Sequence, residues 1–233
     1  MTDDLRRETL ASGKARGFFV TFEGIEGTGK STHARELGKF LRGGGHSVVI
    51  TREPGGTPLG EALRGLLLSH SENAPSGRAE LFMLLAARTQ HVRDVILPAL
   101  NRNEIVLCDR YTDASMAYQG SGRNLGLDAV RAGNNLATGG LVPDITFLLD
   151  ISFEETRRRL ERRKVLDRMD QESEEFFARV RQTYLDLAQA EPDRYCVIDS
   201  GRPTAEVQNE IRTHAVAWLE SNAASSASRE GGE

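Results

Sequence analysis

The stretch VTFEGIEGTGKSTHARELGKFL (residues 20–41) decides the fold of this chain. Its centre, residues 24–31, fits the pattern G-x-x-x-x-G-K-[ST], and it lies between an apolar run and an amphipathic segment. In this pattern backbone N–H groups surround phosphate oxygens, and the helix that follows adds its N-terminal dipole. A plain glycine turn is the alternative, but the preceding strand pattern and the following helix pattern favour a phosphate-binding loop.

The loop contains groups with different expected tasks. Lys30 is expected to reach the β and γ oxygens of a nucleotide, and the Ser31 hydroxyl is expected to hold Mg²⁺. Glu26 is unexpected, because a carboxylate among phosphate-binding groups is costly unless it has a specific task. The residues expected to bind the nucleotide are Gly24, Ile25, Glu26, Gly27, Thr28, Gly29, Lys30, Ser31 and Thr32.

Outside the loop, short apolar runs alternate with amphipathic segments. The apolar runs cover residues 18–22, 47–51, 104–108, 145–149 and 195–198. The helical patterns cover residues 31–42, 79–100, 127–138, 153–163 and 174–190. Strands that alternate with helices predict an α/β fold, with about five parallel strands and helices on both faces of the sheet. Ligands of such folds bind at the carboxyl ends of the strands.

Composition limits the partners and the compartment. The chain has 233 residues and a net charge of −4, which gives no indication of a nucleic-acid partner. No apolar run approaches the roughly 18 residues of a membrane span, and the N-terminus lacks the apolar core of a signal peptide. Cys108 and Cys196 lie in apolar runs and are expected to be reduced thiols. We therefore expect a cytoplasmic protein without membrane contact.

We expect one folded domain between two tails. Residues 1–16 and 222–233 are polar and lack hydrophobic periodicity, so both are predicted to be disordered. The folded domain is expected to cover residues 17–221.

A second charged cluster follows the third apolar run. Asp109 lies at the expected tip of the strand, where it can orient the water shell of Mg²⁺, and Arg110 can hold an anion bidentately. A surface Asp-Arg pair is the alternative. Ser115, Tyr118 and Gln119 are three to four residues apart and would share one helix face. The Gln119 amide, which is both donor and acceptor, suits a nucleobase.

These features fit two classes of protein, a small-molecule kinase and a nucleotide-dependent switch. A guanine-nucleotide switch would read its base through Asn-Lys-x-Asp, and none of the lysines lies in such a sequence. An Asp-x-x-Gly sequence after the third apolar run is also missing. Both observations count against the switch.

Five segments resemble the thymidylate kinases of the bacterial type, over about residues 18–221. They are FEGIEGTGKST, TREPGGTPLGEALR, ELFMLLAARTQHV, LCDRYTDASMAYQGSGR and LDRMDQES, in this order. The resemblance implies a P-loop kinase sheet with a small helical lid at about residues 157–172. It also implies phosphoryl transfer from ATP·Mg²⁺ to dTMP, giving dTDP, by a homodimer. Another nucleoside monophosphate, such as dUMP, is the alternative acceptor.

The resemblance also implies an acceptor site. Arg110 and Arg64 would hold the dTMP phosphate, and Glu53 would line the site. Arg88 and Gln119 would hydrogen-bond the thymine edge, with Ser115 nearby and Tyr118 under the deoxyribose. Leu84 stands where family members often place a phenylalanine on the base, and Phe82 is the nearest aromatic residue.

One branch of the family carries an arginine in the phosphate-binding loop, at the position of Gly27. The missing charge is expected from the lid, because residues 157–168 contain seven basic side chains. Arg163, or else Arg168, is predicted to supply the cation at the transferred phosphate. The resemblance aims Glu26 at the acceptor rather than at ATP.

Overall fold

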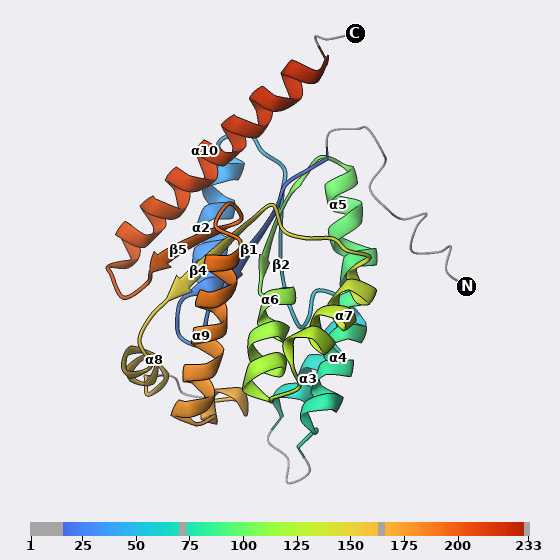
Figure 1. Cartoon of the computed structure of the whole chain (residues 1–233). Helices are drawn as coiled ribbons and strands as arrows, with labels where there is room; N and C mark the ends of the chain where they lie inside the picture. The colour runs from blue at the N-terminus through green and yellow to red at the C-terminus, as the bar shows by residue number, and fades with distance from the viewer. Residues whose placement is uncertain (1–15, 70–73, 163–165, 231–233) are drawn as a thin grey trace, which may run out of the picture.

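The computed structural model describes residues 16–69, 74–162 and 166–230, and its centre is a five-stranded parallel sheet (Figure 1). The strands are β1 (Phe19–Glu23), β2 (Val48–Arg52), β3 (Ile105–Asp109), β4 (Ile145–Asp150) and β5 (Tyr195–Asp199). Their order across the sheet is β2-β3-β1-β4-β5, so β1 pairs with both β3 and β4. The predicted fold class is confirmed, and each predicted strand agrees with the structure to within one residue at either end.

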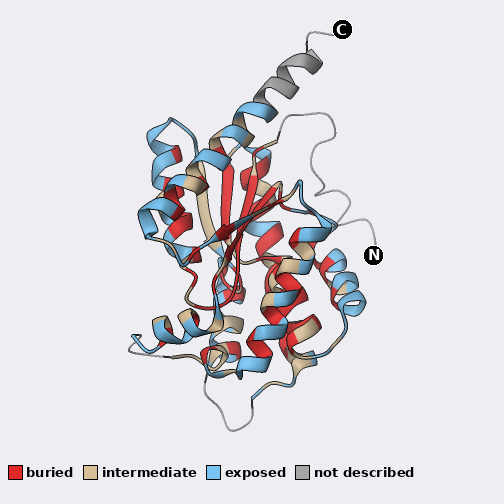
Figure 2. Ribbon diagram, turned by 60° about the vertical axis from the view of Figure 1, so that its left-hand side comes forward, coloured by how far each residue is buried: buried red, intermediate tan, exposed pale blue. Residues whose placement is uncertain are grey.

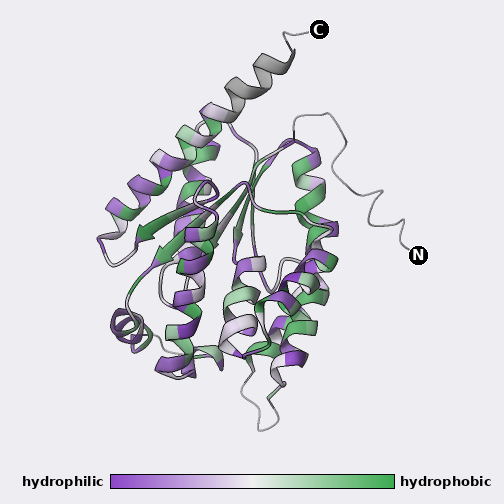
Figure 3. Cartoon of the chain, in the orientation of Figure 1, coloured by the Kyte–Doolittle hydropathy of each residue, from purple (hydrophilic) through white to green (hydrophobic). Residues whose placement is uncertain are grey.

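The sheet forms because its strands are apolar along their length. Every residue of β1 is buried, and so are all but the last residues of β3 and β4. Figure 2 shows the buried strands between helices that are exposed on their outer faces, and Figure 3 shows the strands as hydrophobic segments. Because all five strands are parallel, the polar residues at their carboxyl ends lie at the same edge of the sheet.

Helical segments cover both faces of the sheet. They are α2 (Lys30–Gly43), α3 (Pro58–Leu68), α4 (Gly77–His91), η1 (Val92–Ile96), α5 (Leu97–Asn101), α6 (Thr112–Ser115), η2 (Met116–Gly122), α7 (Leu127–Thr138), α8 (Phe153–Leu160), η3 (Met169–Gln171), α9 (Glu174–Ala190) and α10 (Thr204–Glu230). The predicted helices at 127–138 and 174–190 are confirmed as α7 and α9. The single helix predicted over 79–100 is divided into α4, the π-helical η1 and α5.

Helix α3 was not predicted, although its start carries two recognisable signals. The Thr57 side chain accepts a hydrogen bond from the backbone N–H of Gly60 at 3.0 Å, and Pro58 occupies the first turn. This helix carries Arg64 to the edge of the sheet where the strands end.

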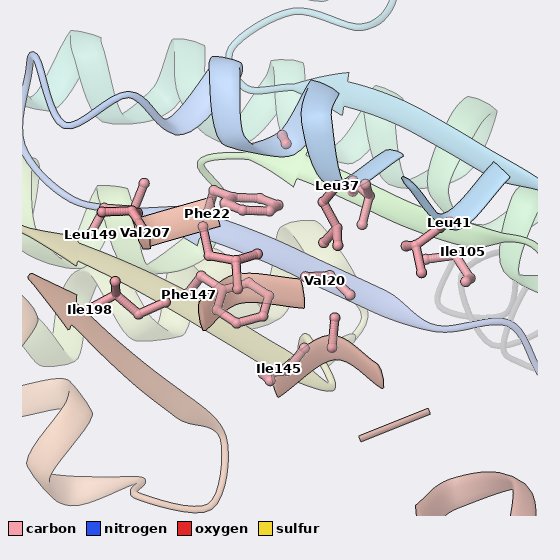
Figure 4. Close-up of a cluster of buried hydrophobic side chains, with 14 residues drawn as sticks. Val20, Phe22, Leu37, Leu41, Ile105, Ile145, Phe147, Leu149, Ile198 and Val207 are labelled. Atoms are coloured by element: carbon pink, nitrogen blue, oxygen red, sulfur yellow. The ribbon is translucent and has the colours of Figure 1, made fainter. Parts of the chain in front are cut away.

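The largest core cluster lies between the sheet and helices α2 and α10. Leu37 and Leu41 of α2 pack against Val20 and Phe22 of β1, and Val207 of α10 completes the layer (Figure 4). The opposite face of the sheet is covered by η1, α5 and α9. This packing fixes β1 at the centre, and with it the loop that follows β1.

Both predicted boundaries of the folded domain need correction. Arg16, assigned to the disordered tail, donates hydrogen bonds to both carboxylate oxygens of Asp144, at 2.8 and 2.6 Å. Helix α10 continues to Glu230, so a disordered segment from residue 222 is wrong as far as that residue. Residues 222–230 contain alanine and no glycine or proline, which lets the helix propagate. Residues 1–15 and 231–233 lie outside the described residues.

No helix in the described part of the chain is both long enough and apolar enough to cross a membrane.

Candidate active site

A cavity of about 450 Å³ opens at the carboxyl ends of β1, β2 and β3. Its walls come from the phosphate-binding loop, the tips of β2 and β3, and segments of α3, α4 and η2. The predicted site residues that line it are Glu26, Gly27, Gly29, Lys30, Ser31, Thr32, Glu53, Arg64, Leu84, Arg88, Asp109, Arg110, Ser115, Tyr118, Gln119 and Arg168. Arg163 lies outside the described residues.

Glycines allow the phosphate-binding loop to turn tightly after β1. Gly24, Gly27 and Gly29 have positive φ angles of 133°, 77° and 88°. A side chain at Gly24 would place its Cβ 2.3 Å from the carbonyl oxygen of Leu149. Only glycine fits that position, which explains the loop's first glycine in physical terms.

Lys30 is held inside the loop. Its Nζ donates hydrogen bonds to the carbonyl oxygens of Gly24 and Ile25, at 2.9 and 2.7 Å, and to Thr28 Oγ1 at 3.3 Å. Burial lowers the pKa of Lys30 from 10.5 to about 8, and the positive charge of Arg110 contributes to the decrease. The three partners of the Lys30 amine form the inner side of the loop. They are Gly24, Ile25 and Thr28, all of which were predicted to bind nucleotide.

Ser31 and Asp109 meet at the cavity, with the Ser31 hydroxyl donating to Asp109 Oδ2. Hydroxyl and carboxylate oxygens are the ligands that Mg²⁺ prefers, and this ion is commonly held by few side chains together with water and substrate phosphates. In the described part of the chain, no group of three or more His, Cys, Asp or Glu side chains could hold a metal. The Ser31–Asp109 pair therefore fits a Mg²⁺ site that the nucleotide completes.

Glu26 points to Arg110 across the mouth of the loop. Arg110 Nη2 donates to Glu26 Oε1 at 2.7 Å, and the Tyr118 hydroxyl donates to Oε2 at 2.6 Å. Arg110 also donates to the carbonyl oxygen of Gly24, at 3.0 Å. The carboxylate inside the phosphate-binding loop is thus compensated by the guanidinium group of the residue that follows β3, which explains how the loop can carry a negative charge.

Arg110 has an unusual backbone, with a φ of +70°. Side chains make this conformation unfavourable by about 1–2 kcal/mol, so neighbouring groups must maintain it. Its own N–H donates to the carbonyl oxygen of Phe22 at 3.0 Å, and the next N–H, of Tyr111, donates to Glu23 Oε1 at 2.7 Å. Burial, together with the charge of Asp113, raises the pKa of Glu23 to about 7. The fold thus fixes the direction of the Arg110 side chain.

Positive charge is concentrated on one side of the cavity. Arg64 donates to the carbonyl oxygen of Pro54 at 3.1 Å. Its pKa is lowered, first by burial and then by repulsion from Arg52 and Arg110. Guanidinium groups that repel one another across a cavity are stabilised when an anion binds between them.

Arg88 is only 1% exposed and lies in a network of acceptors. It donates to Glu53 Oε2 at 2.7 Å, to Ser115 Oγ at 3.0 Å and to the carbonyl oxygen of Tyr111 at 2.9 Å. A further bond to Asn134 Oδ1 measures 2.5 Å. A guanidinium group has five N–H donors, so these four bonds to described residues leave one N–H for a ligand.

Glu53 has a second partner that the sequence analysis did not identify. His91 is fully buried, and its Nδ1 lies 2.9 Å from Glu53 Oε1, while its Nε2 lies 2.6 Å from Thr51 Oγ1. His91 follows Arg88 by one helical turn, so their spacing was the available signal. Together the two side chains hold the Glu53 carboxylate in place.

The predicted single helix face of Ser115, Tyr118 and Gln119 is not observed as such. Helix α6 changes at Met116 into the π-helical η2, a form that often occurs at functional sites. The three buried side chains therefore reach different partners. Ser115 contacts Arg88, Tyr118 contacts Glu26 and Arg110, and the Gln119 amide donates to Glu80 at 3.2 Å.

Leu84 lines the cavity, whereas the neighbouring aromatic residue does not. Phe82 is 70% exposed and does not line the cavity. The aliphatic side chain of Leu84 therefore occupies this part of the wall.

Arg168, one of the two predicted transition-state cations, lies against α3 and α4. Its Nε and Nη2 donate to the carbonyl oxygen of Leu67, at 3.2 and 3.1 Å, and Nη2 lies 2.7 Å from Glu80 Oε1. This placement brings its charge near α3 and α4 rather than to the phosphate-binding loop.

Among the described residues of the basic run, Arg159 of α8 contacts the phosphate-binding loop. It donates to the carbonyl oxygens of Gly27, at 3.0 Å, and Ser200, at 2.8 Å. The sequence analysis did not single out Arg159 within the basic run. The signal was its position beside Thr156 and Leu160, the buried residues of the helix.

A parallel sheet with a phosphate-binding loop after its central strand, and a second cationic site across the same cavity, defines a P-loop nucleotide kinase. A family model described as thymidylate kinase matches residues 22–211. The chain belongs to the thymidylate kinase family.

Individual relatives agree with this assignment. The chain is 48% identical over 206 residues to a thymidylate kinase of Bordetella petrii, covering 88% of this chain and 98% of the relative. It is 49% identical over 192 residues to a thymidylate kinase of Pseudomonas syringae pv. syringae, covering 82% and 91%. The crystal structure of thymidylate kinase from Ehrlichia chaffeensis superimposes with a TM-score of 0.69 at 33% identity, covering 85% of this chain and 98% of the other.

Proposed function

We infer that this protein transfers the γ-phosphoryl group of ATP to dTMP, giving dTDP and ADP. The observation that carries this function is the cavity itself, in which Lys30 of the phosphate-binding loop and the guanidinium groups of Arg64 and Arg110 face one space. Two phosphate-binding sites in one cavity suit transfer between a nucleoside triphosphate and a monophosphate. Membership of a kinase family argues against the nucleotide-dependent switch.

On the donor side, the loop N–H groups bind the ATP phosphates and Lys30 neutralises the charge that develops during transfer. Ser31 and Asp109 would hold Mg²⁺ together with the nucleotide phosphates and water. Bound Mg²⁺ supplies charge stabilisation at the phosphoryl oxygens. The hydroxyl–carboxylate pair at the end of β3 supports this assignment.

On the acceptor side, Arg110 and Arg64 bind the dTMP phosphate in line with ATP. Glu26 orients Arg110 and is proposed to accept a hydrogen bond from the 3′-hydroxyl of the acceptor. Tyr118 packs under the deoxyribose. The fixed backbone of Arg110 supports a positioning role, because phosphoryl transfer depends mainly on alignment and charge.

The thymine base occupies the wall formed by α4 and η2. Leu84 packs against its face, while Arg88 and Gln119 hydrogen-bond its edge. Ser115 and Glu53 hold Arg88 in position. The single unused N–H of Arg88 is directed by four fixed hydrogen bonds, which supports its use in recognition.

We propose Arg159 as the donor-side cation that compensates for Gly27. Its contact with the Gly27 carbonyl oxygen supports this role, and Arg168 acts on the acceptor side. Arg163, the other candidate, lies outside the described residues. Closure of residues 157–172 over ATP remains a prediction.

We also propose that the protein acts as a cytoplasmic homodimer. Phe82 of α4 and Leu136 of α7 are 70% and 75% exposed on neighbouring helices, a feature typical of surfaces covered by a partner. Cys108 and Cys196 are free thiols, which is compatible with a reducing compartment. Phe82→Glu should shift sedimentation toward the monomer, and unchanged sedimentation would contradict this dimer surface.

The function is tested by ADP release with ATP and Mg²⁺ over a panel of dTMP, dUMP, dCMP and dGMP. We expect turnover that depends on dTMP and is lost in Lys30→Ala. Turnover without any dependence on a monophosphate would contradict the proposed reaction.

A further inference from the structure

We propose that Glu80 is a positioning residue that fixes which end of the Gln119 amide faces the base, and that this selects thymine over cytosine. The inference rests on the proposed function, because it concerns the base contact of the same site. It assigns a task to a carboxylate to which the sequence analysis gave no role.

Glu80 is 1% exposed and lies in α4, facing η2. Its Oε2 accepts hydrogen bonds from Gln119 Nε2 at 3.2 Å and from Arg123 Nε at 3.0 Å. Its Oε1 forms an ion pair with Arg168 Nη2 at 2.7 Å, without the alignment of a hydrogen bond. One buried carboxylate is therefore shared by two guanidinium groups and one amide.

The carboxylate cannot easily turn away from Gln119, because both arginines are themselves anchored. Arg123 also binds the Glu172 carboxylate and stacks over the Phe176 ring, 4.8 Å from its centroid. Arg168 donates to a backbone carbonyl oxygen of α3. Glu80 thus presents a fixed acceptor to the amide.

A fixed acceptor determines the orientation of an amide whose two ends are otherwise nearly isosteric. An ionised carboxylate only accepts hydrogen bonds, so the NH₂ end of Gln119 must face Glu80. The carbonyl oxygen then lies at the other end, and within the described part of the chain it has no hydrogen-bond partner. Because Gln119 lines the cavity, this oxygen is available to a ligand.

An acceptor at this position distinguishes the two pyrimidines. Thymine carries an N–H donor at N3, which the Gln119 carbonyl oxygen can accept. Cytosine carries a lone pair at N3, so two acceptors would face each other in a buried site. Arg88 has the same preference, since its remaining N–H suits O4 of thymine and opposes the amino group of cytosine. Buried polar groups without partners are strongly unfavourable, which gives the selection its strength.

The test is Glu80→Gln, which replaces the obligatory acceptor by an amide that can donate or accept. Gln119 can then present its NH₂ end to the base. We expect the ratio of kcat/KM for dTMP to kcat/KM for dCMP to fall at least about tenfold, while KM for ATP changes little. The ratio should not reach unity, because Arg88 still favours thymine.

A matched control separates orientation from structural support. Arg123→Met removes a guanidinium group from Glu80 and its tie to Glu172, but leaves the carboxylate in place. We expect this variant to keep the wild-type ratio of dTMP to dCMP, whatever its effect on turnover. Thermal unfolding by circular dichroism verifies that both variants are folded.

A compensating exchange provides a second measurement. In Glu80→Gln/Gln119→Glu, residue 119 again offers an acceptor to the base, and the amide at position 80 donates to it. We expect the double variant to recover part of the dTMP preference that Glu80→Gln loses.

Each outcome has a definite meaning. An unchanged ratio in Glu80→Gln, or an equal change in Arg123→Met, overturns the role of Glu80 while leaving the kinase function intact. Absence of dTMP turnover in the wild-type enzyme overturns the proposed function, and this inference with it.

Discussion

The lysine of the phosphate-binding loop should weaken the fold that carries it. Burial lowers the pKa of Lys30 from 10.5 to about 8, which means that the folded protein disfavours the charged amine. At about 1.4 kcal/mol per pKa unit, this difference corresponds to roughly 3 kcal/mol of lost stability at neutral pH. We therefore expect Lys30→Met to unfold at higher urea concentration than the wild-type protein at pH 7.

The loop can tolerate the loss of the amine because its acceptors have other donors. The Gly24 carbonyl oxygen also accepts from Arg110, and the Ile25 carbonyl oxygen also accepts from Thr28 Oγ1, both at 3.0 Å. Neither carbonyl oxygen is left unpaired by methionine, whose unbranched side chain fills a similar space.

The stability advantage of Lys30→Met should decrease as pH rises. Below pH 8 Lys30 is charged in both the folded and the unfolded chain, so the full cost is present. Between pH 8 and 10.5 the folded protein loses the proton first, and the cost decreases. Above pH 10.5 the amine is neutral in both states, and the advantage of Lys30→Met should be gone.

The assay is urea unfolding of both proteins at pH 7, 9 and 10.5, without nucleotide. Lys39→Met is the matched control, since Lys39 lies on the same helix with its side chain 70% exposed and should show little change. Phosphoryl transfer should be lost in Lys30→Met alone. If Lys30→Met is no more stable than the wild type at pH 7, the argument from burial is refuted.

Three further predictions concern single residues. Arg110→Ala should raise KM for dTMP and lower kcat, with ATP affinity nearly unchanged; loss of ATP binding in calorimetry would assign it to the donor site instead. Arg159→Ala should lower kcat at least tenfold, about 1.4 kcal/mol of barrier, with little change in KM for dTMP; unchanged steady-state kinetics would return the cationic role to Arg163. Glu23→Gln should gain stability relative to the wild type as pH rises from 5 to 8, because the raised pKa of about 7 makes the ionised carboxyl unfavourable in the fold. If the difference in urea midpoint between variant and wild type is the same at pH 5 and pH 8, the prediction is contradicted.

The strands and the phosphate-binding loop could be predicted because both depend on local sequence. A buried parallel strand needs a continuous apolar run, and the positive φ angles of Gly24, Gly27 and Gly29 are a local requirement of the turn. The same reasoning failed for residues 222–230, where polar composition concealed a sequence able to continue a helix.

Site residues in local motifs could also be predicted, whereas their partners from distant segments could not. Arg110 and Gln119 were predicted through motif spacing, but their partners were not, because pairs such as Gln119–Glu80 are distant in the sequence. The π-helical turn of η2 was also unpredictable, and it sends Tyr118 and Gln119 to different partners. Arg159 was missed because the basic run contains several arginines, and its position beside the buried residues of α8 was not used to distinguish them.

The positive φ at Arg110 has a consequence for protein engineering. Among replacements of Arg110 that lack a cationic side chain, glycine should destabilise the fold least, since it adopts φ values near +70° without steric cost. Arg110→Gly should therefore be more stable than Arg110→Ala, although both lose the guanidinium group. A library randomised at this codon would enrich glycine under selection for thermal resistance and arginine under selection for growth that depends on dTDP synthesis.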